Sequence, residues 1–272
     1  MKINVLTSFL ALTAVVFASG SMTRADDQQA RTSYGQALDL YQQRGQAGKI
    51  DQALSVLASA ETQVTTDNAL KYDIFILEAR AYFWQGTHAA TNDDKKRIHL
   101  AGQQKADQAK TLNPSYADGY YFAGVNLARW AEANGVIASI SHKGQLEQYM
   151  KDSSDPTRTT RDGKTAESVD GYGPDRVLGR MFQKLPGILG GDHNKSLQHL
   201  DIAVQKAPEL ALNTVFLADT LMHGSNDEKA QAKKMLQDLL THDPSTFDSD
   251  RVPETREEFV MAQGLLDGKP LP

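Results

Sequence analysis

Apolar and small residues recur along the chain at steps of three and four, the spacing of one face of an α-helix. This spacing is in the same phase ahead of three prolines, Pro114, Pro208 and Pro244. The matching sets are Gly102, Ala106 and Ala109; Ser196, Leu200 and Ala203; and Ala232, Leu236 and Leu239. Because proline cannot continue a helix, each proline predicts the end of one helix pair and the start of the next. No segment alternates with period two for long enough to predict a strand.

Companion helices carry small residues at matching positions, such as Ala123, Gly124 and Gly179, which allow two helices to approach closely. We count five degenerate helix pairs and a closing helix, at about 32–64, 68–111, 115–150, 174–207, 210–243 and 254–266. The sequence therefore predicts an all-α fold, a superhelical stack of tetratricopeptide-like helix pairs. The alternative is a non-repeating helical bundle, but the shared phase of the three prolines favours the repeat.

The N-terminus has the pattern of a targeting segment. An uncharged apolar run, residues 5–18, follows a basic start and ends at small residues. This pattern predicts a secretory signal peptide over residues 1–25, with cleavage after Ala25. Cleavage after Gly20 and an uncleaved N-terminal anchor are the alternatives. The expected location is the periplasm, and residues 26–272 are expected to form a single helical-repeat domain with no stable membrane span.

Composition and missing motifs exclude several classes of function. The chain has 272 residues, a net charge of −5 and dispersed basic residues, which argues against nucleic-acid binding. It has no cysteine, so disulfides, thiolate metal sites and cysteine nucleophiles are excluded. His-Glu-x-x-His and Gly-x-Ser-x-Gly do not occur, and the segment 187–196 lacks the glycine that precedes the lysine of a phosphate loop. We therefore expect no catalytic residue, metal or cofactor, and no enzyme activity.

A cationic and partly aromatic groove is the candidate binding site. The first helix of each pair lines the concave side of such a stack. The predicted ligand-binding residues on these helices are Arg80, Trp84, Tyr121, Arg129, Arg176, Arg180 and Lys184. Guanidinium groups bind carboxylates with two hydrogen bonds, so a small organic acid is the expected ligand. The alternatives are surface arginines paired with neighbouring acids, and tryptophans that pack in the core.

Two irregular segments interrupt the repeat. Residues 151–171 form a polar insertion between the third and fourth pairs, interpreted as either a binding lid or a mobile linker. Residues 185–192 break the fourth pair where a tight turn would suffice, and Asp192 is a candidate cap for the helix that follows.

The segment from Tyr172 to Pro186, followed by Leu189-Gly190-Gly191-Asp192, resembles the T-component (TatT-like) family of tripartite ATP-independent periplasmic (TRAP) transporters. The resemblance covers about residues 115–245. It implies a helical-repeat superhelix around a cavity, a homo-oligomer, and partnership with a periplasmic solute-binding protein that delivers small organic acids with hydrophobic tails. Members of the family are often lipoproteins, whereas this chain has no cysteine to carry a lipid. The expected function is a binding accessory to TRAP-type uptake; the alternative is a scaffold for envelope proteins or peptides.

Overall fold

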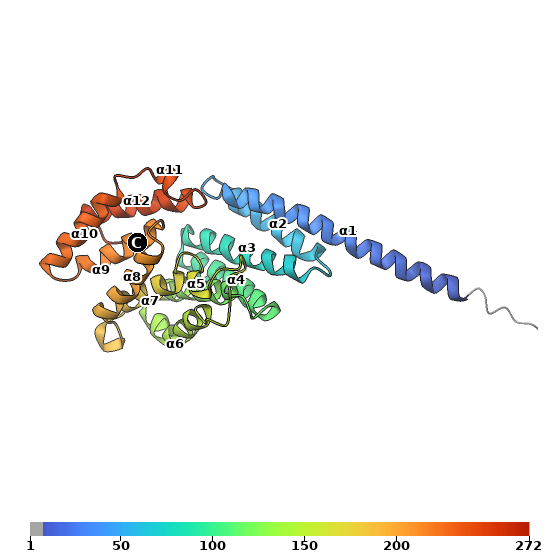
Figure 1. Ribbon diagram of the computed structural model, residues 1–272, viewed down its shortest axis with the longest axis horizontal. Helices are drawn as coiled ribbons and strands as arrows, with labels where there is room; N and C mark the ends of the chain where they lie inside the picture. Colours follow the sequence, from blue (N-terminus) through green and yellow to red (C-terminus); the bar gives the residue numbers. More distant parts are fainter. Residues whose placement is uncertain (1–7, 272) are drawn as a thin grey trace, which may run out of the picture.

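The computed structural model describes the backbone of residues 8–271 and the side chains of residues 25–271. Over this part of the chain the regular elements are all helices, packed as neighbouring pairs (Figure 1). In chain order they are α1 (Ser8–Gln42), α2 (Lys49–Gln63), α3 (Asn68–Thr87), α4 (Asn92–Leu112), α5 (Ala117–Asn134), α6 (Val136–Ser153), α7 (Gly173–Lys184), α8 (His193–Lys206), α9 (Ala211–Met222), α10 (Asn226–Leu239), α11 (Pro244–Phe247) and α12 (Val252–Leu266), with 3₁₀ turns η1 (Ala166–Ser168) and η2 (Gly187–Leu189). The predicted all-α stack of helix pairs is confirmed.

Two of the predicted boundaries differ from the structure. α1 begins at Ser8, well before the predicted start of the first pair at 32. α10 ends at Leu239, and Asp243 and Pro244 open the short helix α11 instead of ending α10. The Asp243 carboxylate accepts a hydrogen bond from the Ser245 N–H, and a proline in the first turn suits a helix start. The predicted signal peptide, 1–25, lies almost entirely outside the residues whose side chains are described.

Several interior helix starts are fixed by local side-chain caps. Asp67, Thr91 and Asp192 accept hydrogen bonds from backbone N–H groups in the first turns of α3, α4 and α8. Ser225 and Glu228 form a reciprocal capping box at the start of α10. The predicted cap at Asp192 is therefore present.

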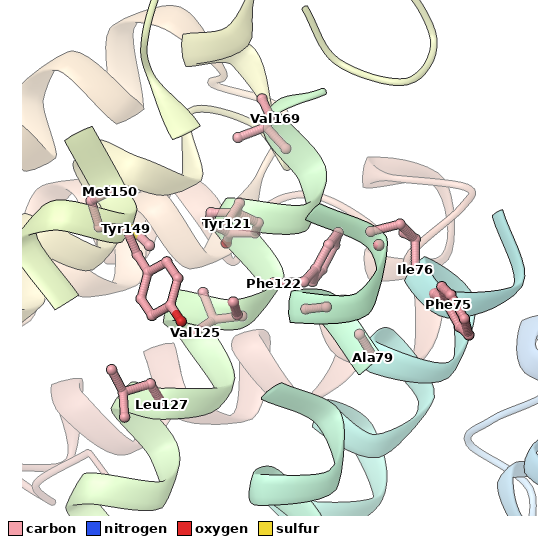
Figure 2. Close-up of a cluster of buried hydrophobic side chains, with 14 of the residues drawn as sticks. Phe75, Ile76, Ala79, Tyr121, Phe122, Val125, Leu127, Tyr149, Met150 and Val169 are labelled. Carbon is pink, nitrogen blue, oxygen red and sulfur yellow. The ribbon is translucent and has the colours of Figure 1, made fainter. Parts of the chain in front are cut away.

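The central core lies among α3, α5 and α6 (Figure 2). Phe75, Ile76 and Ala79 of α3 face Phe122 of α5, and Tyr149 and Met150 of α6 lie on the other side. A second apolar cluster joins α8, α9, α10 and α12, and a third joins α1, α2 and α3. The core therefore follows the stack as three linked segments.

The stack curves until its two ends meet. In Figure 1, α12 reaches the turn between α1 and α2. A Cβ atom built on Gly45 in that turn would lie 3.2 Å from the Cβ of Pro253 in α12. The curved stack is thus closed into a ring by its C-terminal helix.

The polar insertion is a packed strap. We define the strap as residues 154–172, which follow the end of α6 at Ser153. Arg161 donates to both carboxylate oxygens of Asp73 in α3, at 2.7 and 3.0 Å, and Val169 is buried in the central core. The linker interpretation is wrong, because these contacts hold the strap against α3 and α5.

Candidate functional site

A cavity of about 260 Å³ opens on the inner side of the ring. α3, α5, α6, α7, α9 and α12 supply most of its wall. All seven residues predicted from the sequence line it: Arg80, Trp84, Tyr121, Arg129, Arg176, Arg180 and Lys184. The structure therefore brings residues from three predicted helix pairs to one cavity.

The wall combines an apolar surface with an excess of positive charge. Among the described residues that line it, eight are arginine or lysine and five are aspartate or glutamate, although the chain as a whole is acidic. The aliphatic side chains are Val125, Leu127, Ala128, Ala131, Leu146, Val177, Met181, Leu185, Leu212, Met261 and Leu271. Charges beside an apolar wall act in a low dielectric, so their attraction for an anion is stronger than in water.

Arg176 organises the wall through hydrogen bonds within the protein. Its Nη2 donates to the Asp170 carboxylate at 2.5 Å and to the Tyr121 hydroxyl at 2.8 Å. Its Nη1 donates to Asn213 Oδ1 at 2.9 Å and to the Gly171 carbonyl at 3.2 Å. These contacts use both terminal guanidinium nitrogens, and direct contact of Arg176 and Tyr121 with a ligand stays a prediction.

Asp170 is the negative centre of this network. Its backbone φ of 50° lies in the left-handed region, which residues other than glycine adopt infrequently. Burial favours the neutral acid, but the charges of Arg251 and Arg176 outweigh burial and lower the pKa of Asp170. Asp170 is therefore ionised and holds two arginines at the base of the cavity.

Arg180 and Arg129 are also paired. Arg180 bonds to the carboxylate of Asp219, and its guanidinium lies 4.7 Å from the centre of the Phe216 ring. Arg129 donates to Glu132 at 3.0 Å and is about one-third exposed. Both arginines add positive electrostatic potential to the cavity, but some of their guanidinium N–H groups already bond to carboxylates.

Arg80 and Lys184 are the two cations left available. The Arg80 guanidinium lies over the Tyr41 ring at 5.1 Å and the Phe122 ring at 5.9 Å. Within residues 25–271 neither Arg80 nor Lys184 forms an ion pair with a carboxylate. Burial and the nearby charge of Arg180 lower the pKa of Lys184, which is the signature of an uncompensated cation. These two side chains are the best placed to receive an anionic group.

Trp84 has a packing role. It is buried in the N-terminal apolar cluster, and its ring lies 4.1 Å from that of His88. This position agrees with the packing alternative and leaves only part of the indole at the cavity wall.

Sequence reasoning missed the cavity residues outside the repeat phase. Arg44 lies in the turn after α1, Asp170 in the strap, and Arg251 and Glu258 at α12. Arg251 donates to Asp170 at 3.1 Å and to Glu258 at 3.2 Å. No spacing in the sequence links these positions, because the contacts join segments up to two hundred residues apart.

The fold and this cavity define the molecule as an all-α helical-repeat protein with a cationic, apolar-walled cavity. No known protein family and no curated protein matches the chain. In the part of the chain that the structure describes, no group of three or more His, Asp or Glu side chains could hold a metal ion. No described helix has both the length and the apolar character required to cross a membrane.

Proposed function

We propose that this protein binds small organic acids in its central cavity, as a periplasmic accessory to TRAP-type uptake. The observation that carries the binding proposal is the pair Arg80 and Lys184, two cations without carboxylate partners on an apolar wall. A ligand with one carboxylate and an apolar body would satisfy both features. The resemblance of residues 172–192 to the TRAP T-component family supports the transport context, and the N-terminal sequence pattern supports the periplasmic location.

Calorimetry with acetate, hexanoate and benzoate tests the binding proposal. We expect hexanoate and benzoate to bind more tightly than acetate, because their apolar bodies fill the wall. Arg80→Gln and Lys184→Gln should each weaken binding about tenfold or more, the loss typical of a hydrogen bond to a charged group. Arg97→Gln is the matched control, because Arg97 is exposed on α4 and does not line the cavity.

Equal affinity for hexanoate in wild type and in Arg80→Gln would contradict the proposal.

The location of the protein has a separate test. The protein recovered from the periplasm should begin at Asp26, as N-terminal sequencing would show if residues 1–25 are a cleaved signal.

A scaffold for envelope proteins or peptides is the competing proposal. It predicts an open groove lined by polar side chains that can hold an extended chain. The wall is instead largely apolar, with aliphatic and aromatic side chains from α5, α7, α9 and α12. This composition supports a small ligand over a peptide.

A further inference from the structure

The helix that closes the ring is attached differently along its length. Towards its C-terminal end, Phe259, Ala262 and Leu265 of α12 pack in the apolar cluster of α8, α9 and α10. Towards its N-terminal end, Glu254 and Glu258 line the cavity. α12 is therefore bound firmly to the C-terminal helices and presents charged groups to the N-terminal ones.

The contact between α12 and the first half of the chain is polar. Arg44 donates to Glu254 Oε1 at 2.7 Å and to the Asp250 carbonyl at 3.1 Å. His88 at the end of α3 contacts Glu257 at 2.9 Å. In the described residues, none of the three apolar clusters contains both α12 and the hairpin formed by α1 and α2.

We call this contact, formed by Arg44 and His88 with Glu254 and Glu257, the seam. A polar seam of this kind separates more easily than an apolar interface. When ion pairs open, water replaces each lost partner, whereas an opened apolar interface has no such compensation. The seam also borders the cavity, since Arg44, His88, Glu254 and Glu257 all line it. Opening at the seam would expose the ligand site without disturbing any of the three cores.

The charges at the seam connect its closure to the ligand site. The Asp170 carboxylate lies under the influence of Arg251 from α12, Arg176 and Arg80. Closure therefore brings Arg251 close to Arg80, which forms no ion pair in the described part of the chain and shares the negative charge of Asp170 with Arg251 and Arg176. A bound anion would offset this excess of positive charge, and a ligand shifts a conformational equilibrium towards the state that it binds better.

We propose that α12 is a movable clasp, whose seam with the N-terminal hairpin opens to admit the anion and closes when the anion binds at Arg80. The identity of the anion that closes the clasp rests on the proposed function, whereas the motion of α12 is a property of the protein alone. The two parts can therefore be tested separately.

The chain has no cysteine, so a single engineered pair can report on the seam. The double variant Gly45→Cys and Pro253→Cys places two sulfurs across it, where the Cβ separation of 3.2 Å has to widen slightly to reach the roughly 3.5–4.5 Å of a disulfide. Adding Glu254→Gln should slow disulfide formation under diamide severalfold, because it weakens closure. Lys105→Gln is the matched control, since it breaks ion pairs with Glu61 and Glu78 far from the seam. An unchanged rate with Glu254→Gln would overturn the clasp.

The ligand arm uses hexanoate, followed by the fluorescence of Trp84 in the cavity wall, with the second tryptophan replaced by Trp130→Phe. We expect the oxidised double variant to take up and release hexanoate about tenfold more slowly than its reduced form, because closure blocks exchange. Hexanoate should also speed disulfide formation. Equal exchange in both forms would overturn the gating role. Failure of hexanoate to bind the reduced protein would count against the proposed ligand and the anion coupling, while the cross-linking rates would still decide the motion.

Discussion

At the scale of single residues, the hydrogen-bond partners of the buried arginines show which of them hold the fold together and which can still bind a ligand. Arg176 exhausts its terminal nitrogens on Asp170, Tyr121, Asn213 and the strap backbone. Removing one partner from such a buried network leaves an uncompensated charge, which typically destabilises a fold by about 3–5 kcal/mol. Arg80, by contrast, lies against the rings of Tyr41 and Phe122 and forms no ion pair with a carboxylate in the described residues.

His99 is a second buried polar residue, and it has a consequence for stability at acid pH. Its Nδ1 lies 3.2 Å from Asn126 Oδ1, and Asn126 donates to the carbonyls of Ala79 and Phe122. Burial lowers the pKa of His99 from 6.5 to about 4, against the opposing effect of Asn126. His99 is therefore neutral in the folded protein at neutral pH and donates its Nδ1 proton to Asn126.

We expect this histidine to destabilise the protein as the pH falls from 6.5 towards 4. The unfolded chain binds the proton of His99 more strongly than the folded one. The contribution of neutral His99 to stability is therefore complete above pH 6.5 and is lost as the pH falls from 6.5 to 4. Between pH 7.5 and 5 the loss is about 2 kcal/mol. Urea denaturation of wild type and His99→Gln at both pH values measures it. An equal pH dependence in the two proteins would show that His99 does not titrate in this window.

At the scale of elements, the glycines set how closely the helices of a pair approach. A Cβ on Gly179 of α7 would lie 2.5 Å from Leu200 Cγ and 3.1 Å from the Ser196 carbonyl in α8. These are three of the positions that the repeated spacing identified, which is why periodicity predicted this pair correctly. The wider turn at 185–192 lies outside that spacing.

Gly179→Ala should lower the free energy of unfolding by about 1–3 kcal/mol, the usual effect of overpacking. The added methyl group meets Leu200 and the α8 backbone, so α7 and α8 must move apart. Gly187→Ala in η2 is the control, because a Cβ there meets nothing within 4 Å. Chemical denaturation of both variants checks the prediction, and a similar loss in the two would rule out the helix-pair contact as its cause.

The sequence could predict helices but not every partner of the cavity residues. Steps of three and four placed Arg80, Arg180 and Lys184 on inward-facing positions, and all of them line the cavity. Which of these cations lack a carboxylate partner depends on where Asp170 and Asp219 lie in the folded protein. Asp170 lies in a strap without periodicity, and Asp219 reaches Arg180 only after two helix pairs have packed. Helical spacing carries no information about such pairings.

At the scale of the whole molecule, the ring has three apolar cores and one polar closure. Each core joins only neighbouring helices, as in other repeat architectures, where stability is approximately a sum of local terms. Damage to one core should therefore remain local. A globally cooperative fold would instead lose protection in every helix.

Phe259→Ala distinguishes these two behaviours. Phe259 is buried between α12 and the helices before it, and its truncation should cost about 3–5 kcal/mol locally. Amide hydrogen exchange should accelerate in α9 to α12 and remain unchanged in α2 to α5. Leu57→Ala, in the N-terminal core, should give the reverse pattern. Faster exchange throughout the ring in either variant would mean that the polar seam transmits stability, and that α12 is fastened too tightly to act as a clasp.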